Sequence, residues 1–377
     1  MTARISAITM PRWGMTMAQG KVARWLVAEG SEVRPGMAVA EIETAKITTV
    51  LEASGEGILR RVVVPPGGSA AVGSVMAITA SASTSDAEID GFLQDQITND
   101  GDNRAETMAT VSPHIVAAGA HRLNVLRLGA GSALPVIFVH GFGGDLKSWL
   151  FNQPVIADHR VAYALDLPGH GSSSATHGKG SVRVLSEAVI ALMDAETISR
   201  AHLVGHSMGG AISLLLAFGN PARVASVTGI APGGLGPELN RHFIDGFIAA
   251  DGQPAMTTAL GLLFARPDTV SRTMVDEALH DKRQDGALAA LEDIAAANFT
   301  VDGQKSGLRE LLLSLKCPVQ IIWGREDRII PVSQSTGLPA SIPVTVVDGA
   351  GHMPHMEKAA EVNRLISAFI AKSEELQ

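Results

Sequence analysis

The chain has 377 residues, of which 46% are hydrophobic, and its formal net charge is −8 at pH 7. This length predicts two domains of about 100–200 residues each. The longest aliphatic run, AISLLLAF, is too short to span a membrane, and the acidic charge disfavours binding to nucleic acid or anionic lipid. With Cys317 as the only cysteine and no signal-peptide pattern at the N-terminus, we expect a cytoplasmic protein.

An internal repeat occupies the first part of the chain. Residues 20–40, GKVARWLVAEGSEVRPGMAVA, align with residues 57–77, GILRRVVVPPGGSAAVGSVMA, so that glycines of the two halves coincide. Each half alternates apolar and polar residues and is broken at glycines, as expected for short strands joined by tight turns. Since neither half could bury an apolar face alone, we predict an all-β sandwich or barrel over residues 1–80.

One lysine, Lys46, lies in the stretch EIETAKITTV that joins the two halves. Its position alone would make it an ordinary surface lysine. With the repeat around it, however, residues 1–80 resemble the lipoyl domain of 2-oxo acid dehydrogenase complexes, which implies covalent lipoate on Lys46. Ala45 stands where that family usually has an acidic residue. Biotin carriers flank their lysine with methionines, which Ala45 and Ile47 do not match, so lipoate is favoured.

Residues 81–112 differ in composition from both neighbouring regions. They are small, polar and acidic, with Arg104 as the only basic residue. Such a segment has too few apolar residues to form a core. We therefore predict a flexible acidic linker, with room for a short helix around IDGFLQDQI, on which the first domain can swing.

From residue 113 onward, apolar strands alternate with helices. The predicted strands include PVIFVHG, VAYALDL, AHLVGHS, VASVTGI, VQIIWG and VTVVDG, and the predicted helices include VRVLSEAVIALMDA, MGGAISLLLAF and EKAAEVNRLISAFIA. Strands that are apolar on both faces are typical of a parallel sheet covered by helices on both sides. Residues 113–377 are therefore predicted to form an α/β domain, with residues from about 235 to 312 as a helical cap.

Residues 205–209, GHSMG, form a G-x-S-x-G motif between a predicted strand and a predicted helix. In this context the glycines permit a sharp turn that exposes the hydroxyl of Ser207. A serine hydroxyl is a weak nucleophile and needs a base. His352, which follows the last predicted strand, is the candidate base, and Asp327, which follows the strand before it, is the candidate group to orient the imidazole.

Backbone N–H groups are needed to stabilise the negative charge that develops on an acyl oxygen. Residues 140–144, HGFGG, follow a predicted strand and contain the glycines that such a turn needs. We expect the N–H groups of Phe142 and Met208 to form this oxyanion hole, and we expect no metal in the site.

Other polar residues lie close to these motifs. His355 also follows the last predicted strand, but the G-x-G-H pattern favours His352. The glutamate next to Asp327 is disfavoured, because the D-x-x-x-P spacing begins at the aspartate. We expect His206 and Asp166 to have structural roles.

The four motifs of residues 113–377 occur in the order found in the α/β-hydrolase superfamily, which this region resembles. The resemblance implies a Ser207–Asp327–His352 triad on a mostly parallel sheet. The fusion of this domain to a lipoyl domain resembles the acyltransferase components of acetoin dehydrogenase complexes. That resemblance implies transfer of an acetyl group from lipoyl-Lys46 to coenzyme A, with thiamine-diphosphate-dependent dehydrogenase subunits and dihydrolipoamide dehydrogenase as partners.

Two alternatives stay open at this point. The same triad would serve a serine esterase or thioesterase with an attached lipoyl carrier domain. The hydrolase-like domain could instead only dock partners, although no triad residue is missing. The predicted cap has more acidic than basic residues, so the phosphates of coenzyme A would need backbone amides as ligands.

Overall fold

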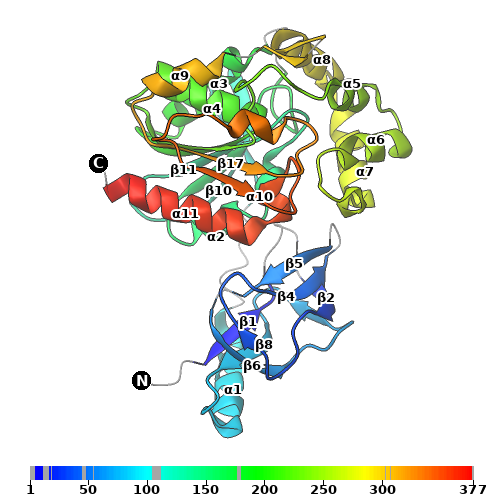
Figure 1. Ribbon diagram of the computed structural model, residues 1–377, viewed down its shortest axis with the longest axis vertical. Helices are drawn as coiled ribbons and strands as arrows, with labels where there is room; N and C mark the ends of the chain where they lie inside the picture. The colour runs from blue at the N-terminus through cyan, green and yellow to red at the C-terminus, as the bar shows by residue number, and fades with distance from the viewer. Residues whose placement is uncertain are drawn as a thin grey trace. The chain divides into compact units, whose positions relative to one another are not determined.

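The chain folds into two units, Met1–Val111 and Ser112–Gln377 (Figure 1). The computed structural model describes residues 5–11, 17, 19–44, 48–53, 55–103, 112–175, 180–301, 303–305 and 307–375. Among the helices described, none is both long enough and apolar enough to cross a membrane.

Two four-stranded antiparallel sheets form the N-terminal unit. The first contains, in spatial order, β1 (Ser6–Thr9), β8 (Val75–Ala80), β6 (Gly57–Val62) and β3 (Glu32–Val33). The second contains β5 (Thr48–Glu52), β4 (Ala38–Glu43), β2 (Gln19–Trp25) and β7 (Ser69–Ala71).

The internal repeat explains how these two sheets depend on each other. Strands β2, β3 and β4 belong to the first half of the repeat, and β6, β7 and β8 are their equivalents in the second half. Strand β3 pairs with β6, and β7 pairs with β2, so each half supplies one strand to the other half's sheet. The apolar side chains between the sheets, including Val22, Ile42, Leu59 and Met76, are buried. Neither half has a complete core without the other.

The predicted lipoyl lysine belongs to the hairpin formed by β4 and β5. The last antiparallel pair in this hairpin joins Glu43 to Thr48, so residues 44–47 connect the two strands. Lys46 itself lies outside the described residues.

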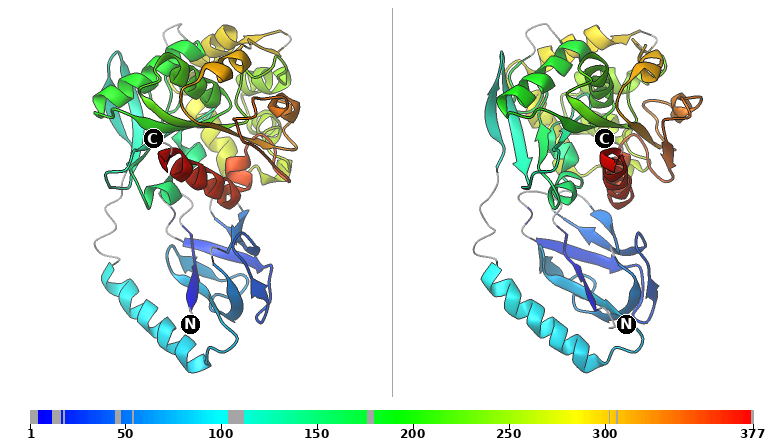
Figure 2. Two further views of the ribbon diagram at one scale, coloured as in Figure 1. Left: turned by 60° about the vertical axis from the view of Figure 1, so that its left-hand side comes forward. Right: turned by 90° about the vertical axis from the view of Figure 1, so that its left-hand side faces the viewer.

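The short helix expected around IDGFLQDQI is present but longer, because helix α1 (Asp86–Asn103) has 18 residues. The helix begins at a capping box: the backbone N–H of Ser85 donates to the Glu88 carboxylate (2.8 Å), and the N–H of Glu88 donates to Ser85 Oγ (3.3 Å). Ile89 is buried, and Arg60 of β6 donates to the backbone oxygens of residues 81 and 84. These contacts join the first turns of α1 to the sheets. Figure 2 shows the helix together with the sheets of this unit.

An eight-stranded sheet is the centre of the second unit. Its spatial order is β18 (Val344–Val347), β17 (Val319–Gly324), β14 (Val224–Ile230), β13 (Ala201–His206), β11 (Val136–Val139), β12 (Ala162–Leu165), β10 (His121–Leu128) and β9 (His114–Ala118). The strands from β18 to β12 are parallel, and β10 and β9 add an antiparallel edge. The predicted mostly parallel sheet is therefore present.

Helices cover both faces of this sheet, as Figure 1 shows. Helices α3 (Val182–Ala195) and α4 (Met208–Gly219) pack on one face, and α2 (Gln153–Ala157) and α11 (Ala359–Glu375) pack on the other. Between β14 and β17 the chain forms α5 (Arg241–Ala249), α6 (Gln253–Gly261), α7 (Arg272–Lys282) and α8 (Ala287–Asn298). Helices α5 to α8 with their connections are called the cap below. The short elements β15 (Phe299–Thr300), β16 (Gly303–Gln304) and α9 (Leu308–Leu311) lead from the cap back to the sheet.

Candidate active site

Ser207 is the single residue between the end of β13 and the start of α4. Its backbone has φ 53° and ψ −116°, a conformation that residues other than glycine rarely adopt. The surrounding backbone holds it there, because its N–H donates to the oxygen of Ile230 (2.9 Å) and its C=O accepts from the N–H of Gly233 (2.9 Å). Such strain, fixed from both sides, is typical of a nucleophile turn.

The two glycines of the G-x-S-x-G motif are required by close contacts. A Cβ atom at Gly205 would lie 2.3 Å from the oxygen of Gly209, and a Cβ atom at Gly209 would lie 2.0 Å from the oxygen of Val139. No side chain fits at either distance. The glycines therefore allow α4 to approach β11 and β13 closely enough to form the turn.

Asp327 and His352 follow two neighbouring parallel strands, β17 and β18, and meet beyond their carboxyl ends. The Nδ1 atom of His352 lies 2.8 Å from Oδ2 of Asp327, and both side chains are almost fully buried. This contact fixes the imidazole so that Nε2 is the nitrogen left to exchange a proton with a substrate or hydroxyl group. Asp327 and His352 are 25 positions apart in the sequence, so the fold is what brings them into contact.

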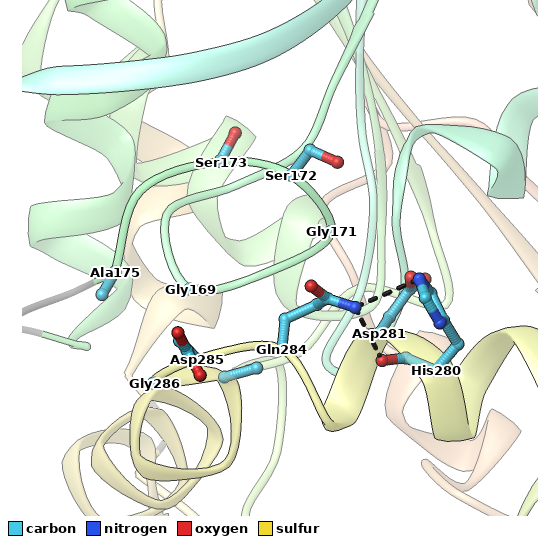
Figure 3. Close-up of a pocket in the computed structure, with 11 residues that line it drawn as sticks. Gly169, Gly171, Ser172, Ser173, Ala175, His280, Asp281, Gln284, Asp285 and Gly286 are labelled. Carbon is cyan, nitrogen blue, oxygen red and sulfur yellow. Dashed lines mark hydrogen bonds between the residues drawn. The ribbon is translucent and has the colours of Figure 1, made fainter.

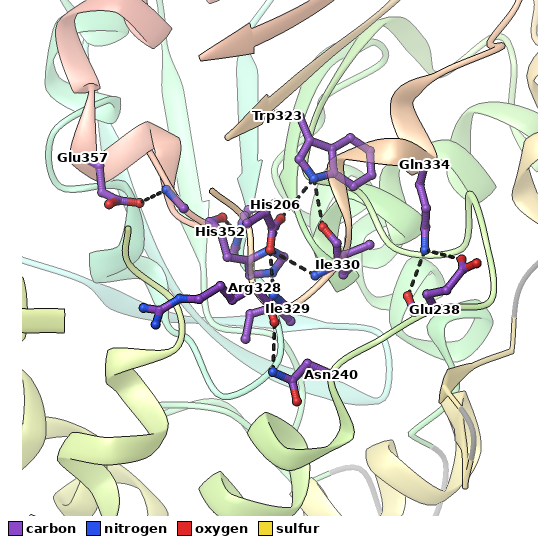
Figure 4. Close-up of polar contacts among 12 residues, drawn as sticks. His206, Glu238, Asn240, Trp323, Arg328, Ile329, Ile330, Gln334, His352 and Glu357 are labelled. Carbon is purple, nitrogen blue, oxygen red and sulfur yellow. Dashed lines mark hydrogen bonds and ion pairs between the residues drawn. The ribbon is translucent and has the colours of Figure 1, made fainter. Parts of the chain in front are cut away.

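The carboxylate of Asp327 is held by four hydrogen bonds. Besides the bond to His352, its Oδ2 accepts from Nε1 of Trp323 (3.0 Å), and its Oδ1 accepts from the N–H groups of Ile329 (2.8 Å) and Ile330 (3.0 Å) (Figure 4). Both oxygens are therefore fixed before any substrate binds. Trp323 was not among the predicted site residues.

The backbone of His352 is held as firmly as its side chain. Its N–H donates to the oxygen of Leu263 in the cap (2.8 Å), and its C=O lies 2.8 Å from Nε2 of His206. A carbonyl can only accept, so His206 carries its proton on Nε2. Burial lowers the pKa of His206 well below its ordinary value, with smaller contributions from His355 and His352, and keeps it neutral. The structure thus places His206 against the backbone of His352.

The predicted oxyanion donors lie on two turns that meet near the serine. Gly141, next to Phe142, is so close to Ser207 that a Cβ atom there would lie 3.1 Å from the serine Cβ. Met208 is the first residue of α4, where backbone N–H groups have no partner within the helix. Among the described residues, none accepts a hydrogen bond from the N–H of Phe142 or of Met208. Both N–H groups therefore stay candidates for the oxyanion hole.

The ring of Phe142 connects this turn to aromatic residues beyond it. Its centroid lies 6.0 Å from that of Phe247 on α5 and 5.8 Å from that of Phe299 on β15, both in edge contacts. Phe142 and Phe247 are buried. The cap thus contributes apolar surface next to the turn that carries the predicted oxyanion donor.

Asp166 supports the loops, as expected. Its carboxylate accepts from Nδ2 of Asn124 (2.8 Å) and from the N–H groups of Leu146 (2.8 Å) and Ser172 (2.9 Å). Burial, assisted by the nearby charge of Asp145, raises the pKa of Asp166 to about 6.

The side chain of His355 is buried. Neither of its ring nitrogens has a partner within the described part of the chain. Its ring packs between those of His206 (centroids 4.6 Å apart) and Trp149 (4.6 Å). Burial, with a smaller contribution from His352, lowers the pKa of His355 to about 3.

A pocket of about 410 Å³ lies between the loop of residues 169–175 and residues 280–287, where α7 is joined to α8 (Figure 3). Asp281 and Asp285 line it, and burial raises the pKa of Asp281 to about 6. This acidic lining is unfavourable for the phosphates of coenzyme A.

Comparisons with known families agree with this architecture. Residues 6–78 match the family described as biotin-requiring enzyme, and residues 135–359 match the alpha/beta hydrolase fold. A meta-cleavage product hydrolase from Pseudomonas fluorescens IP01 has 21% identity and a TM-score of 0.62, over 69% of this chain and 98% of that one. A hydrolase from Rhodococcus sp. strain RHA1, BphD, has 20% identity and a TM-score of 0.63 over the same shares. The chain is thus a lipoyl-type domain followed by an α/β-hydrolase domain, which confirms the predicted fold class.

Two relatives extend over nearly the whole chain. The dihydrolipoyllysine-residue acetyltransferase component of the acetoin cleaving system of Pseudomonas putida is 40% identical over 98% of this chain and 100% of the relative. The component of the same name from Cupriavidus necator is 38% identical over 97% of each chain. The chain belongs to this family of acetyltransferase components, which confirms the resemblance inferred from the sequence.

Proposed function

We propose that this protein moves an acetyl group from a dihydrolipoyl arm on Lys46 to coenzyme A by way of an acyl-serine at Ser207. The observation that carries the proposal is the buried contact between His352 and Asp327, in a chain that also has the strained Ser207 turn and a lipoyl-type domain. Family membership supports the acetyltransferase reaction.

The N-terminal unit fits a carrier of lipoate. Strands β4 and β5 are paired as far as Glu43 and Thr48, and Lys46 stands between these two residues in the sequence. Lipoate bound to this lysine would supply the thiol that brings the acetyl group as a thioester. The strands of the hairpin would present that lysine to the catalytic domain.

The first half of the reaction forms the acyl-serine. Ser207 Oγ attacks the thioester carbon while Nε2 of His352 takes the hydroxyl proton, and Asp327 stabilises the resulting imidazolium. The N–H groups of Phe142 and Met208 stabilise the negative charge on the acyl oxygen. The bond from carbon to sulfur then breaks, and His352 gives its proton to the leaving sulfur.

The second half releases the serine. The thiol of coenzyme A gives its proton to His352, and its sulfur attacks the carbon of the acetyl-serine ester. The ester oxygen leaves as Ser207 Oγ and takes the proton back from His352. Acetyl-coenzyme A and the free enzyme result, and no oxidant or reductant is consumed.

The partners follow from the same proposal. The relatives are components of a cleaving system, so the family works with other subunits. We infer that thiamine-diphosphate-dependent dehydrogenase subunits load the arm and that dihydrolipoamide dehydrogenase reoxidises it, in the cytoplasm.

Hydrolysis is the second candidate, because the same triad would serve it and because solved hydrolases share the fold. Water would then resolve the acyl-serine and release acetate. The two candidates differ only in the acceptor, so the product distinguishes them.

The fate of the acetyl group tests the proposal. Lipoylated full-length protein, reduced and acetylated, is expected to form acetyl-coenzyme A faster than acetate when coenzyme A is added. Ser207→Ala, His352→Ala and Asp327→Asn should each slow transfer by at least about a thousandfold, since the three groups act as one unit. Ser186→Ala, which removes a hydroxyl that donates to the oxygen of Arg183 in its own helix, is the control. Acetate as the main product, unaffected by coenzyme A, would support hydrolysis instead.

A further inference from the structure

The segment of residues 261–265, which ends α6 and follows it, lies directly against the loop of the proposed catalytic histidine. The N–H of His352 donates to the oxygen of Leu263 (2.8 Å). A Cβ atom at Gly351 would lie 2.6 Å from the nitrogen of Ala265 and 2.9 Å from the oxygen of Leu263. The cap backbone and the histidine loop are therefore in contact without any side chain between them. A shift of one requires a shift of the other.

Two charged side chains hold this segment in place. The Nη2 atom of Arg328 donates to the backbone oxygens of Gly261 (2.7 Å) and Phe264 (2.5 Å). The Glu357 carboxylate accepts from the N–H of Ala265 through Oε2 (2.8 Å) and from the N–H of Gly351 through Oε1 (2.7 Å). One carboxylate thus joins the cap to the histidine loop. Hydrogen bonds to charged groups are about twice as strong as neutral ones.

Arg328 and Glu357 each lie close in the sequence to a residue of the proposed triad. Arg328 is the residue after Asp327, and Glu357 is the last residue of α10 (Pro354–Glu357), the short helix that follows the histidine. Figure 4 shows Arg328, His352 and Glu357 in one region of the domain. The cap segment is therefore held from both loops that carry the acid and the base.

We propose that Arg328 and Glu357 are positioning residues that couple the 261–265 segment of the cap to His352. The inference rests on the proposed role of His352 as the base. While the segment is docked, the histidine backbone is held by Leu263 on one side and by His206 on the other. When the segment moves away, His352 loses one of these two supports, and proton transfer with Ser207 becomes inefficient. Small displacements of a catalytic group are costly to the rate.

The test compares Glu357→Gln with Glu187→Gln, which changes an exposed glutamate on α3. The N–H groups of Ala265 and Gly351 bond to different oxygens of the carboxylate, and in glutamine an NH2 donor replaces one of these oxygens, so one of the two bonds is lost. In the full-length protein we expect the acylation rate with p-nitrophenyl acetate to fall by about tenfold or more, with KM changed less than about twofold. Amide exchange should rise together in peptides that contain Leu263 and His352.

Arg328→Met provides a second, independent variant, with Arg364→Met at an exposed site of α11 as its control. Methionine has no hydrogen-bond donor, so both bonds from Nη2 to the oxygens of Gly261 and Phe264 are lost. If Glu357→Gln does not fold, this variant decides the question by the same two measurements. We expect its acylation rate to fall and the two peptides to lose protection together.

Two outcomes would overturn the inference, and a third would overturn only the proposed function. Loss of protection in the cap peptide alone, with an unchanged acylation rate, would show that the two side chains only fasten the cap and would overturn the coupling. Variants that behave like their controls in both measurements would overturn it as well. If the unchanged protein is not acylated at Ser207, but the two peptides still lose protection together, the serine mechanism fails while the coupling stands.

Discussion

At the scale of single residues, the site depends on a strained backbone turn at Ser207 and on a carboxylate at Asp327 with fixed hydrogen bonds. Ser207 has a positive φ although it is not glycine, and its N–H and C=O are both held by backbone hydrogen bonds, to Ile230 and Gly233. Asp327 has donors on both carboxylate oxygens. The geometry of the proposed triad is therefore set before substrate arrives, which is how preorganised sites reduce the cost of reaching the transition state.

Gly209→Ala tests the close packing behind the serine turn. The new methyl group would lie 2.0 Å from the oxygen of Val139 and 2.5 Å from that of His140, so α4 must move. We expect a loss of about 2–3 kcal/mol in unfolding free energy and near-complete loss of acylation at Ser207. Urea unfolding and an acylation assay measure the two effects.

Gly219→Ala, in the same helix, is the matched control for that change. Nothing lies within 4 Å of the position that its Cβ would occupy. Because alanine is the better helix former, we expect an unchanged or slightly higher unfolding free energy and full activity. Equal losses from the two substitutions would contradict the role given to close packing at Gly209.

His355→Phe tests the cost of burying a neutral histidine. The pKa of His355 is lowered to about 3, so between pH 6.5 and 3 the unfolded chain takes up a proton that the native protein does not. Stability that is present above pH 6.5 is lost as the pH falls, with a slope of about 1.4 kcal/mol per pH unit for one such group. Phenylalanine keeps a ring between Trp149 and His206 and removes this slope.

Urea unfolding of the full chain at several pH values measures that difference. At neutral pH the variant should be at least as stable as the natural chain, since two unpaired buried nitrogens are removed. His159→Gln, at an exposed position, is the control. A variant whose stability falls with acid as steeply as that of the natural chain would show that His355 is not held neutral in the fold.

At the scale of elements, α1 shows how local bonds can order a polar segment. The helix has too few apolar residues to form a core, but it does not need a core of its own. Ser85 and Glu88 satisfy the first N–H groups, Ile89 packs against the sheets, and Arg60 binds the preceding carbonyl oxygens. The start of the helix is thus part of the lipoyl-type unit.

Arg60→Met should release this helix from the sheets. The substitution removes bonds to the oxygens of Ser81 (2.9 Å) and Thr84 (2.8 Å), and the ion pair with Asp86. We expect faster amide exchange over residues 86–94 and little change within β6. Arg34→Met, which removes an exposed ion pair with Glu32, is the control. Unchanged protection of the helix in Arg60→Met would mean that its capping box, the buried Ile89 and the ion pair between Arg61 and Asp90 suffice without Arg60.

At the scale of the whole molecule, the carrier and the proposed catalyst belong to different units of the chain. Lys46→Arg should therefore abolish transfer from a dehydrogenase to coenzyme A. It should leave the turnover of a small free thioester unchanged, since Ser207, Asp327 and His352 all belong to the second unit. Parallel assays with the two acyl donors measure this. Loss of both activities would mean that the first unit is needed for catalysis itself.

The sequence by itself determined the features that arise from local chemistry. The repeat predicted two interdependent β halves, the apolar strands predicted a parallel sheet, and GHSMG predicted a strand, a sharp turn and a helix at Ser207. These patterns are readable because each depends on neighbours in the chain: alternation, turn glycines and helix periodicity. The motif order also identified Asp327 and His352 as candidates.

Only the tertiary structure decided which distant groups meet. It brought Nδ1 of His352 to the Asp327 carboxylate, placed His206 and Leu263 on the two sides of the histidine backbone, and set Arg328 and Glu357 against the cap. It also replaced part of the expected coil by α1. These contacts join residues far apart in the chain, and several use backbone atoms, which are chemically the same at every position. Apart from the pairing of His352 with Asp327, which the motif order predicted, no residue pattern along the sequence could therefore reveal them.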